Sequence, residues 1–270
     1  MTADGLDNLL DATGKVLKIA PDVYKDGLQP SVKESGKSLS LIPRAINAAL
    51  APLQKWIIYK EYSIKETEAL LEEKLKNISA EKIVTPEAYV AVPTLQAISY
   101  CMDCYELRDM FANLLAKSMN VDTKNLVHPS FSEIIKQLSP LDANIIKLFE
   151  FKTTYPLVQY WAYTDSDSGG INVETNIFLD YPAANNLQQI ASSISNLDRL
   201  GIIQASYDAS FTDKTVYSKF YKTTLFNNYT QLLGKPGTSF TGYNKIDITE
   251  GLAKLTPLGK NFIATCVKSF

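Results

Sequence analysis

The sequence predicts an α+β fold that is mostly helical, with a helical region over residues 1–137 and a winged-helix-like domain over residues 138–270. Apolar residues recur at helical spacing in the first half. After Phe151, aromatic and β-branched residues gather in short runs that favour strands. The last third then follows the element order of a winged helix with a strand hairpin and wing insertions, so the second domain is assigned by analogy of that order.

The first sixty residues contain two helix signals separated by helix breakers. Leu6–Ala20 predicts a short amphipathic helix, and residues 21–37 hold two prolines and two glycines. Leu39–Tyr59 has the clearest pattern, because its apolar residues are spaced 3, 4, 4, 3 and 4 apart and share one helical face. Pro52 lies inside this helix and is expected to kink it. The face consists of Leu39, Ile42, Ile46, Leu50, Leu53 and Ile57.

Leu39–Tyr59 has two interpretations. Amphipathic helices most often cover a soluble core. The alternative is a membrane-perturbing helix, because Trp56 and Tyr59 lie among basic residues at one end, as in helices that bind a membrane interface. We favour the core helix, because the polar face holds few Lys and Arg for attraction to anionic lipids.

Capping signals divide the rest of the first half. Ser63-x-x-Glu66 matches a capping box and predicts a helix that runs to about Asn77. Thr85-Pro86 predicts another helix start, and Pro93 is expected to break that helix into two pieces. Asp103-x-x-Glu106 gives a further cap before an apolar stripe. The stripe consists of Leu107, Phe111, Leu114, Leu115 and Met119.

Residues 126–150 hold two helix starts, one after the other. His128 is the only histidine, and the proline after it fits a helix start. Ser139-Pro140 is expected to end that helix and to cap the next one. A lone histidine without a partner motif rarely carries a mechanism, so we interpret this stretch as structural. The predicted structural motif is His128, Pro129, Phe131 and Pro140.

The C-terminal half mixes strand and helix signals. Strands are expected at residues 157–164 and 171–179, followed by a helix over residues 182–200 that stops at Gly201. Residues 202–207 and 216–226 are expected to be paired strands. Residues 227–249 predict a long loop with strand pieces, and Thr256-Pro257 starts a last helix that ends near Lys268.

The composition indicates a protein of a reducing compartment. The net charge of −2 and the pI of about 5.6 argue against a sequence-wide attraction to nucleic acid or anionic lipid. The three cysteines form no regular disulfide framework. The acidic N-terminus is not a signal peptide, and no apolar run is long enough to span a membrane. We therefore expect a cytoplasmic protein.

No motif dictates a reaction. Cys101-x-x-Cys104 has the spacing of a zinc half-site or a redox pair, but without a second CxxC we favour two small buried side chains. Residues 232–239 contain glycines and a lysine but lack the GK[ST] end of a phosphate loop. The sequence therefore predicts no catalytic residue, no metal and no cofactor, and hence a protein that is not an enzyme.

The helix expected over residues 182–200 would face DNA in a winged helix. Its polar side chains could hydrogen-bond bases, but only one cation accompanies them. Other lysines follow in the expected wing, and we favour solvated surface lysines over phosphate contacts. The candidate contacts are Asn185, Gln188, Gln189, Ser192, Asn196 and Arg199 on the helix, and Lys214, Lys219 and Lys222 on the wing side.

Several phrases of the chain resemble the Abi-alpha family, named for abortive infection. DVYKDGLQPSVKESGKSL at residues 22–39 and ALAPLQKWI at residues 49–57 are similar to its N-terminal part. ELRDMFANLLAKSMN at residues 106–120 and HPSFSEIIKQLSPLDANII at residues 128–146 are similar to its most recognisable block. The similarity spans about Asp22 to Phe149. It implies a bacterial role in phage defence, in which infected cells die or stop growing, and it implies no catalytic residues.

These inferences predict a non-enzymatic phage-defence protein that acts through contacts with a phage or host protein or with nucleic acid. A winged-helix DNA-binding regulator is the first alternative, and a membrane-perturbing effector that acts through residues 39–59 is the second. The sequence supports a protein partner better than DNA and disfavours a membrane. It leaves the oligomeric state open.

Overall fold

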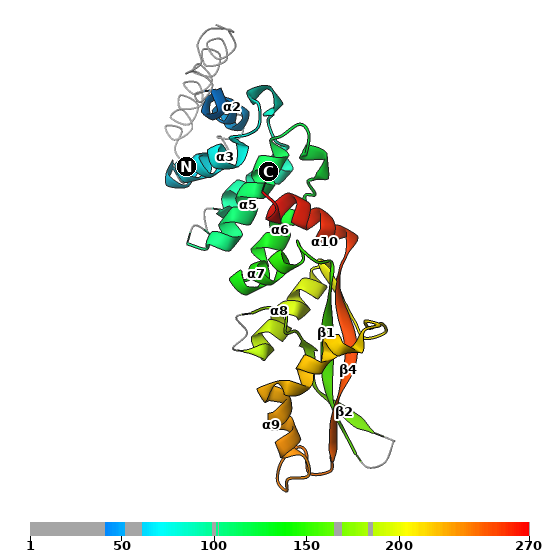
Figure 1. Ribbon diagram of the computed structural model, residues 1–270. Helices are drawn as coiled ribbons and strands as arrows, with labels where there is room; N and C mark the ends of the chain where they lie inside the picture. The colour runs from blue at the N-terminus through cyan, green and yellow to red at the C-terminus, as the bar shows by residue number, and fades with distance from the viewer. Residues whose placement is uncertain are drawn as a thin grey trace, which may run out of the picture.

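The computed structural model describes residues 41–51, 61–98, 101, 103–164, 169–182 and 186–269. The described part is elongated, with helices at one end and a curled antiparallel sheet toward the other (Figure 1). The helix expected at Leu6–Ala20, the breaker-rich region after it and the kink expected at Pro52 lie outside the described residues.

The helical end is built from the first half of the chain. α2 packs its apolar face, including Ile46, Ala49 and Leu50, against α3, α4 and α5, as a core helix does. Among the described residues, no helix combines the length and apolar character needed to cross a bilayer. The helices are α2 (Leu41–Leu50), α3 (Glu61–Leu75), α4 (Ala88–Ile98), α5 (Tyr105–Ser118), α6 (Ser130–Lys136) and α7 (Pro140–Leu148), with short 3₁₀ turns η3 (Ala80–Lys82) and η4 (Lys124–Leu126).

α4 continues through Pro93, so the break expected there is absent. A proline in a helix interior removes one backbone hydrogen bond. The turn around it is held by the Thr94 hydroxyl, which donates to the Val90 carbonyl oxygen at 2.7 Å. Val90, Ala91 and Leu95 are buried on the same helix, so tertiary packing outweighs the local breaking tendency.

One expected helix start is displaced. The described part of α3 already includes Ser63, the residue that was expected to cap this helix. α5 takes Cys104 as its N-cap residue, without a side-chain capping bond, and Asp103 precedes it. The shift in α5 is one residue, because packing of its apolar face fixes where the helix begins and a local capping pattern is secondary to it.

The two helix starts expected in residues 126–150 are confirmed. α6 follows Pro129, and α7 begins at Pro140 with Ser139 as its N-cap. The Ser139 hydroxyl accepts a hydrogen bond from the Asp142 N–H at 3.1 Å, and the Asp142 carboxylate accepts one from the Ser139 N–H at 2.7 Å. This capping box satisfies backbone donors at both ends of the first turn.

The sheet has four antiparallel strands in the order β2-β1-β4-β3. The two strands expected after residue 157 form its β2–β1 side. The strand expected at residues 202–207 is also present, but it pairs with residues 252–255 and not with residues 216–226 as expected. The strands are β1 (Thr154–Tyr163), β2 (Gly170–Ile177), β3 (Ile203–Ser206) and β4 (Lys245–Leu255).

The strand expected at residues 216–226 is wrong, because this segment is helical. Thr223 caps the second of its two helices by accepting a hydrogen bond from the Phe226 N–H at 3.0 Å. Tyr217 and Phe220 are three residues apart, so they share one face of the 3₁₀ helix, and both are buried against the sheet. The C-terminal helices are α8 (Leu187–Arg199), η5 (Lys214–Lys222), α9 (Thr224–Leu232), α10 (Pro257–Phe262) and a π-helical extension η6 (Ile263–Val267).

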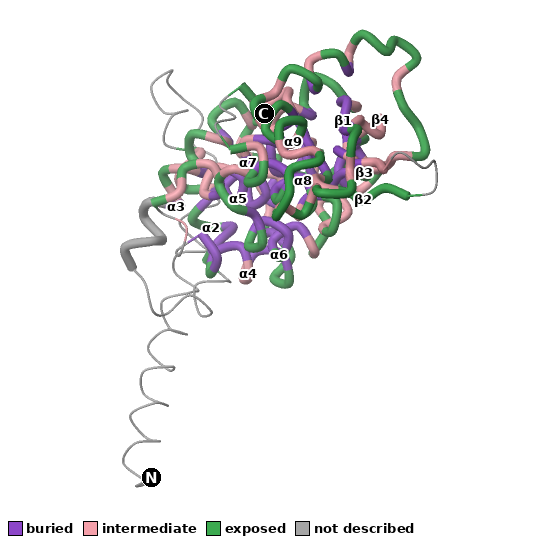
Figure 2. The backbone as a smooth tube through the Cα atoms, turned by 90° about the horizontal axis from the view of Figure 1, so that it is seen from below, coloured by how far each residue is buried: buried purple, intermediate pink, exposed green. Residues whose placement is uncertain are grey.

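Buried residues lie along the middle of the molecule, where the backbone is drawn in purple (Figure 2). The largest cluster joins α5, α6 and α7 to β1, α8, β3 and α10, and therefore includes residues from both sides of position 138. The fold is thus α+β. The strand order does not confirm the winged-helix interpretation, because the hairpin expected at residues 202–226 is replaced by a distant β3–β4 pair. The domain boundary at residue 138 stays a prediction.

Candidate functional site

A shallow groove of about 600 Å³ lies between the N-terminus of α7 and one side of α8. It brings three of the predicted contact residues, Gln189, Ser192 and Asn196, beside the capping box of α7. Asn185, the first predicted contact, lies outside the described residues. Most of the residues that line the groove have uncharged polar side chains, although apolar atoms form most of its exposed surface. Its lining residues are Ser139, Pro140, Leu141, Asp142, Gln189, Ser192, Ser193 and Asn196.

Asn196 and Arg199 hold α8 against the α6–α7 turn. The Asn196 side-chain amide donates to Asp142 Oδ2 at 3.0 Å and to the Gln137 carbonyl oxygen at 2.9 Å. The Arg199 guanidinium donates to Gln137 Oε1 at 3.1 Å and to Asn196 Oδ1 at 2.7 Å. The bond from Asn196 helps to satisfy the Asp142 carboxylate, which is buried. Both predicted contacts therefore already serve the packing of α8.

The remaining polar residues of α8 differ in what they contact. Asn186 caps the helix by accepting from the Gln188 N–H at 3.1 Å, and the Gln188 side chain donates to Glu174 Oε1 of β2 at 3.0 Å. The Ser192 hydroxyl donates to the Gln188 carbonyl oxygen at 3.0 Å. Gln189 and Ser192 are exposed and line the groove, so they are the two predicted residues best placed to meet a partner.

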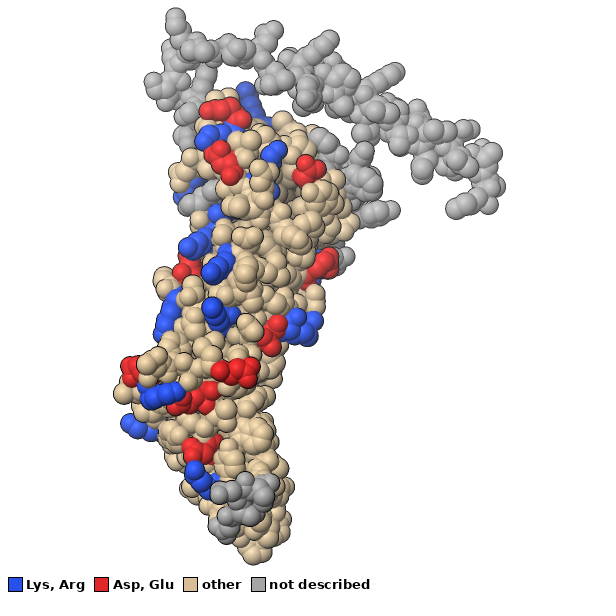
Figure 3. Space-filling model, turned by 90° about the vertical axis from the view of Figure 1, so that its right-hand side faces the viewer, with Lys and Arg blue, Asp and Glu red and all other residues tan. Residues whose placement is uncertain are grey.

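The three predicted wing lysines lie on η5, which is helical. The Lys214 ammonium pairs with Glu250, and the Lys219 ammonium lies 2.6 Å from the Asp180 carboxylate. Lys222 lines a second cleft of about 460 Å³, between the N-termini of α8 and α9. None of the three lines the groove. On the face drawn in Figure 3, basic and acidic side chains are interspersed.

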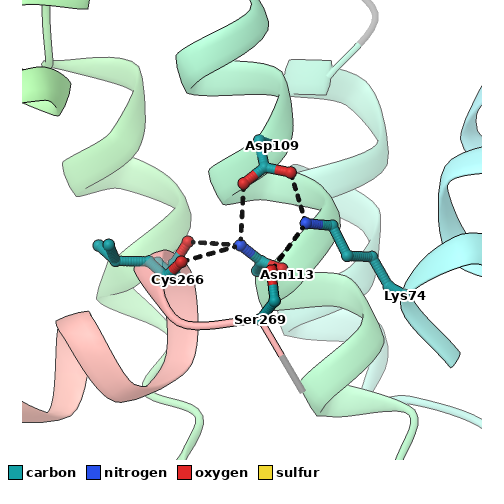
Figure 4. Close-up of polar contacts among 6 residues, drawn as sticks. Lys74, Asp109, Asn113, Cys266 and Ser269 are labelled. Carbon is teal, nitrogen blue, oxygen red and sulfur yellow. Dashed lines mark hydrogen bonds and ion pairs between the residues drawn. The ribbon is translucent and has the colours of Figure 1, made fainter. Parts of the chain in front are cut away.

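The sequence did not predict a buried polar network that ties α3 and α5 to the C-terminal segment (Figure 4). The Lys74 ammonium lies 2.5 Å from Asp109 Oδ1, with side-chain exposures of 11% and 20%. The Asn113 amide donates to Asp109 Oδ2 at 3.2 Å and to the carbonyl oxygen of Cys266 at 3.1 Å. The available signal was the aspartate and the asparagine that lie four residues apart in α5 and therefore share one face of the helix.

The residues weighed for nucleophilic or metal chemistry are scattered. His128 is exposed, and its Nδ1 lies 2.7 Å from the hydroxyl of Ser130. Cys266 is fully buried, which raises the pKa of its thiol well above the usual range. Cys101 and Cys104 are half-buried rather than buried. Within the described ranges, no three His, Cys, Asp or Glu side chains gather as metal ligands.

Comparison with known proteins gives one result. The family model described as "Abortive infection alpha" matches residues 59–266, which is most of the 270-residue chain. Searches of curated proteins and of solved structures give no match. The match begins later than the sequence phrases at residues 22–57 suggested, and it extends through the sheet and α10. It includes the groove, the buried network and both helix starts of residues 126–150. The chain therefore belongs to the abortive infection alpha family.

Proposed function

We propose that the protein acts in bacterial phage defence through contact with a phage or host protein, and not as an enzyme. The family match over residues 59–266 carries the defence part of the proposal. The shape of the groove supports the contact part. Sites for small molecules enclose most of the ligand surface, whereas this groove is shallow and is lined by two helices.

The chemistry of the groove favours a protein over DNA. DNA binding depends on Lys and Arg that neutralise phosphates. Arg199, the cation of α8, is bound to Gln137 and Asn196, while Lys214 and Lys219 are in ion pairs with carboxylates. Uncharged groups such as the Gln189 amide and the Ser192 hydroxyl suit the hydrogen-bonding part of a protein interface. A winged-helix regulator is therefore the second candidate, supported by the polar face of α8 alone.

A matched pair of substitutions tests the proposal. Gln189→Arg places a long cation in the groove, and Gln231→Arg makes the same change on the exposed side of α9. Each variant is expressed in bacteria that are challenged with a phage panel, and plaque counts and host survival are measured. We expect wild type and Gln231→Arg to reduce plating, and Gln189→Arg to lose that reduction while melting as wild type does.

Two outcomes would contradict different parts of the proposal. Unchanged plating by the wild-type protein across the panel would exclude the defence role. Full protection by a stably folded Gln189→Arg variant would exclude the groove as the contact surface. A gel-shift assay on the same proteins tests the alternative that the groove binds DNA. In that case DNA affinity should fall steeply as the salt concentration rises, and it should be higher for Gln189→Arg than for wild type.

A further inference from the structure

Cys101 and Cys104 lie at the two ends of a turn that joins α4 to α5. The Cys104 N–H donates to the Cys101 carbonyl oxygen at 3.0 Å. A bond of this kind closes a turn whose end Cα atoms lie within about 7 Å, and disulfides span Cα separations of roughly 4.4–6.8 Å. Both thiols are free and half-buried at the edge of the largest apolar cluster. The backbone therefore already holds the two cysteines near bonding separation.

Burial and the neighbouring cysteine both act on the Cys101 thiol. Burial raises the pKa of the Cys101 thiol, and the nearby Cys104 raises it further.

Cys104 has the surroundings of an attacking thiol. It is the N-cap residue of α5, a helix of 14 residues, whose N-terminal end favours a thiolate. Its thiol donates to Glu106 Oε2 at 3.8 Å. The Glu106 backbone N–H and then the Asn144 side chain lower the pKa of this carboxyl, so it is ionised at neutral pH and accepts the thiol hydrogen bond, while the thiol proton leaves to solvent when Cys104 reacts.

We propose that Cys101 and Cys104 form a reversible redox site that exchanges with small disulfides such as oxidised glutathione. The Cys104 thiolate attacks one sulfur of the small disulfide, whose S–S bond breaks and releases one thiolate. The Cys101 thiolate then attacks the Cys104 sulfur of this mixed disulfide and releases the second small thiolate. The protein loses two electrons and two protons as its disulfide forms, and the small disulfide gains them as two thiols. This site is independent of the proposed defence role.

Cys266 provides an internal control in the same chain. It is fully buried and its thiol pKa is raised, so it should neither ionise nor exchange in the folded protein. The experiment equilibrates the full-length native protein in glutathione buffers from fully reduced to fully oxidised. The protein is then quenched in acid, denatured and labelled at free thiols, and its linkages are mapped by peptide mass spectrometry.

We expect labelled thiols to fall from three to one as the buffer becomes oxidising, with a Cys101–Cys104 linkage that dithiothreitol reverses. Cys266→Ser should keep this transition, while Cys101→Ser and Cys104→Ser should each abolish the internal linkage. Cys104 in the Cys101→Ser variant should react faster with iodoacetamide than Cys101 in the Cys104→Ser variant. The proposal fails if both thiols stay free in oxidised glutathione, if Cys104 stops at a mixed disulfide with glutathione, or if the linkage joins another pair.

Discussion

Asn113→Leu removes the side chain at the centre of the network that fastens the C-terminal segment. Leucine branches at the same carbon as asparagine, is somewhat larger, and forms no side-chain hydrogen bonds. The substitution deletes the donor to Cys266 O at 3.1 Å and to Asp109 Oδ2 at 3.2 Å. Lys74 still neutralises Asp109, so the carboxylate keeps one partner while the buried carbonyl of Cys266 loses the one that Asn113 supplied.

The magnitude follows from these contacts. Leaving a buried carbonyl without a partner costs ~1–3 kcal/mol, and losing a bond to a carboxylate costs ~1.5–3 kcal/mol. One term opposes them: Asn113 Oδ1 is buried without a partner, and its removal returns ~1 kcal/mol or more. The net expected loss is ~2–4 kcal/mol in the free energy of unfolding. For a chain of this size, that corresponds to a melting temperature lower by roughly 5–15 °C.

Asn261→Leu is the matched control, because Asn261 is exposed on α10 of the same C-terminal segment. Urea unfolding gives the free energies, and hydrogen exchange followed by mass spectrometry reports residues 263–269 separately. We expect Asn113→Leu to lower stability and to speed exchange in that segment, with Asn261→Leu close to wild type. Equal stability and equal exchange in the two variants would refute the network as a fastening of the C-terminal segment.

Three other changes have defined outcomes. Phe131→Ala should cost ~3–5 kcal/mol in urea unfolding, because the ring is fully buried. Gly259→Ala should cost ~1–3 kcal/mol or more, because a Cβ there would overlap the Ile202 carbonyl oxygen, whereas Gly242→Ala meets nothing within 4 Å and should be far milder. Burial raises the pKa of Tyr160 to about 12. An unfolded tyrosine loses its proton near pH ~10, so the free energy of unfolding should fall between about pH 10 and 12. In Tyr160→Phe, the slope of the free energy of unfolding against pH over this range should be smaller by the equivalent of about one proton.

Local chemistry explains which elements the sequence predicts. The start of α7 depends on Ser139, Pro140 and Asp142 alone, and it occurs where expected. The end of α8 depends on Gly201, which has a φ of 71° that favours glycine, and it also matches. These signals depend on residues that are neighbours in the chain, so they do not change with the way distant segments pack.

Elements that depend on distant partners were not predictable in the same way. The aromatic run around Tyr217 and Phe220 fits a strand or a 3₁₀ helix, and only the sheet that covers it decides between them. β3 pairs with β4 across roughly forty residues, so no hairpin signal marks the pair. The groove was partly predictable, because the polar side of α8 was visible, but its other wall comes from α7. For these elements, packing between distant segments determines the secondary structure and the pairing, and local propensity does not.

The cysteine pair and the groove are joined by a short connection through α5. Glu106 accepts a hydrogen bond from the Cys104 thiol and another from the Asn144 amide of α7, the helix that forms one wall of the groove. Disulfide formation removes the thiol bond, which is worth below about 1 kcal/mol, and the turn is already closed by its backbone hydrogen bond. The capping box and the apolar cluster hold α7 independently of that bond. We therefore expect Cys104→Ser to protect against phage as well as wild type does. Lost protection in a Cys104→Ser variant that melts normally would show that the redox site controls the groove.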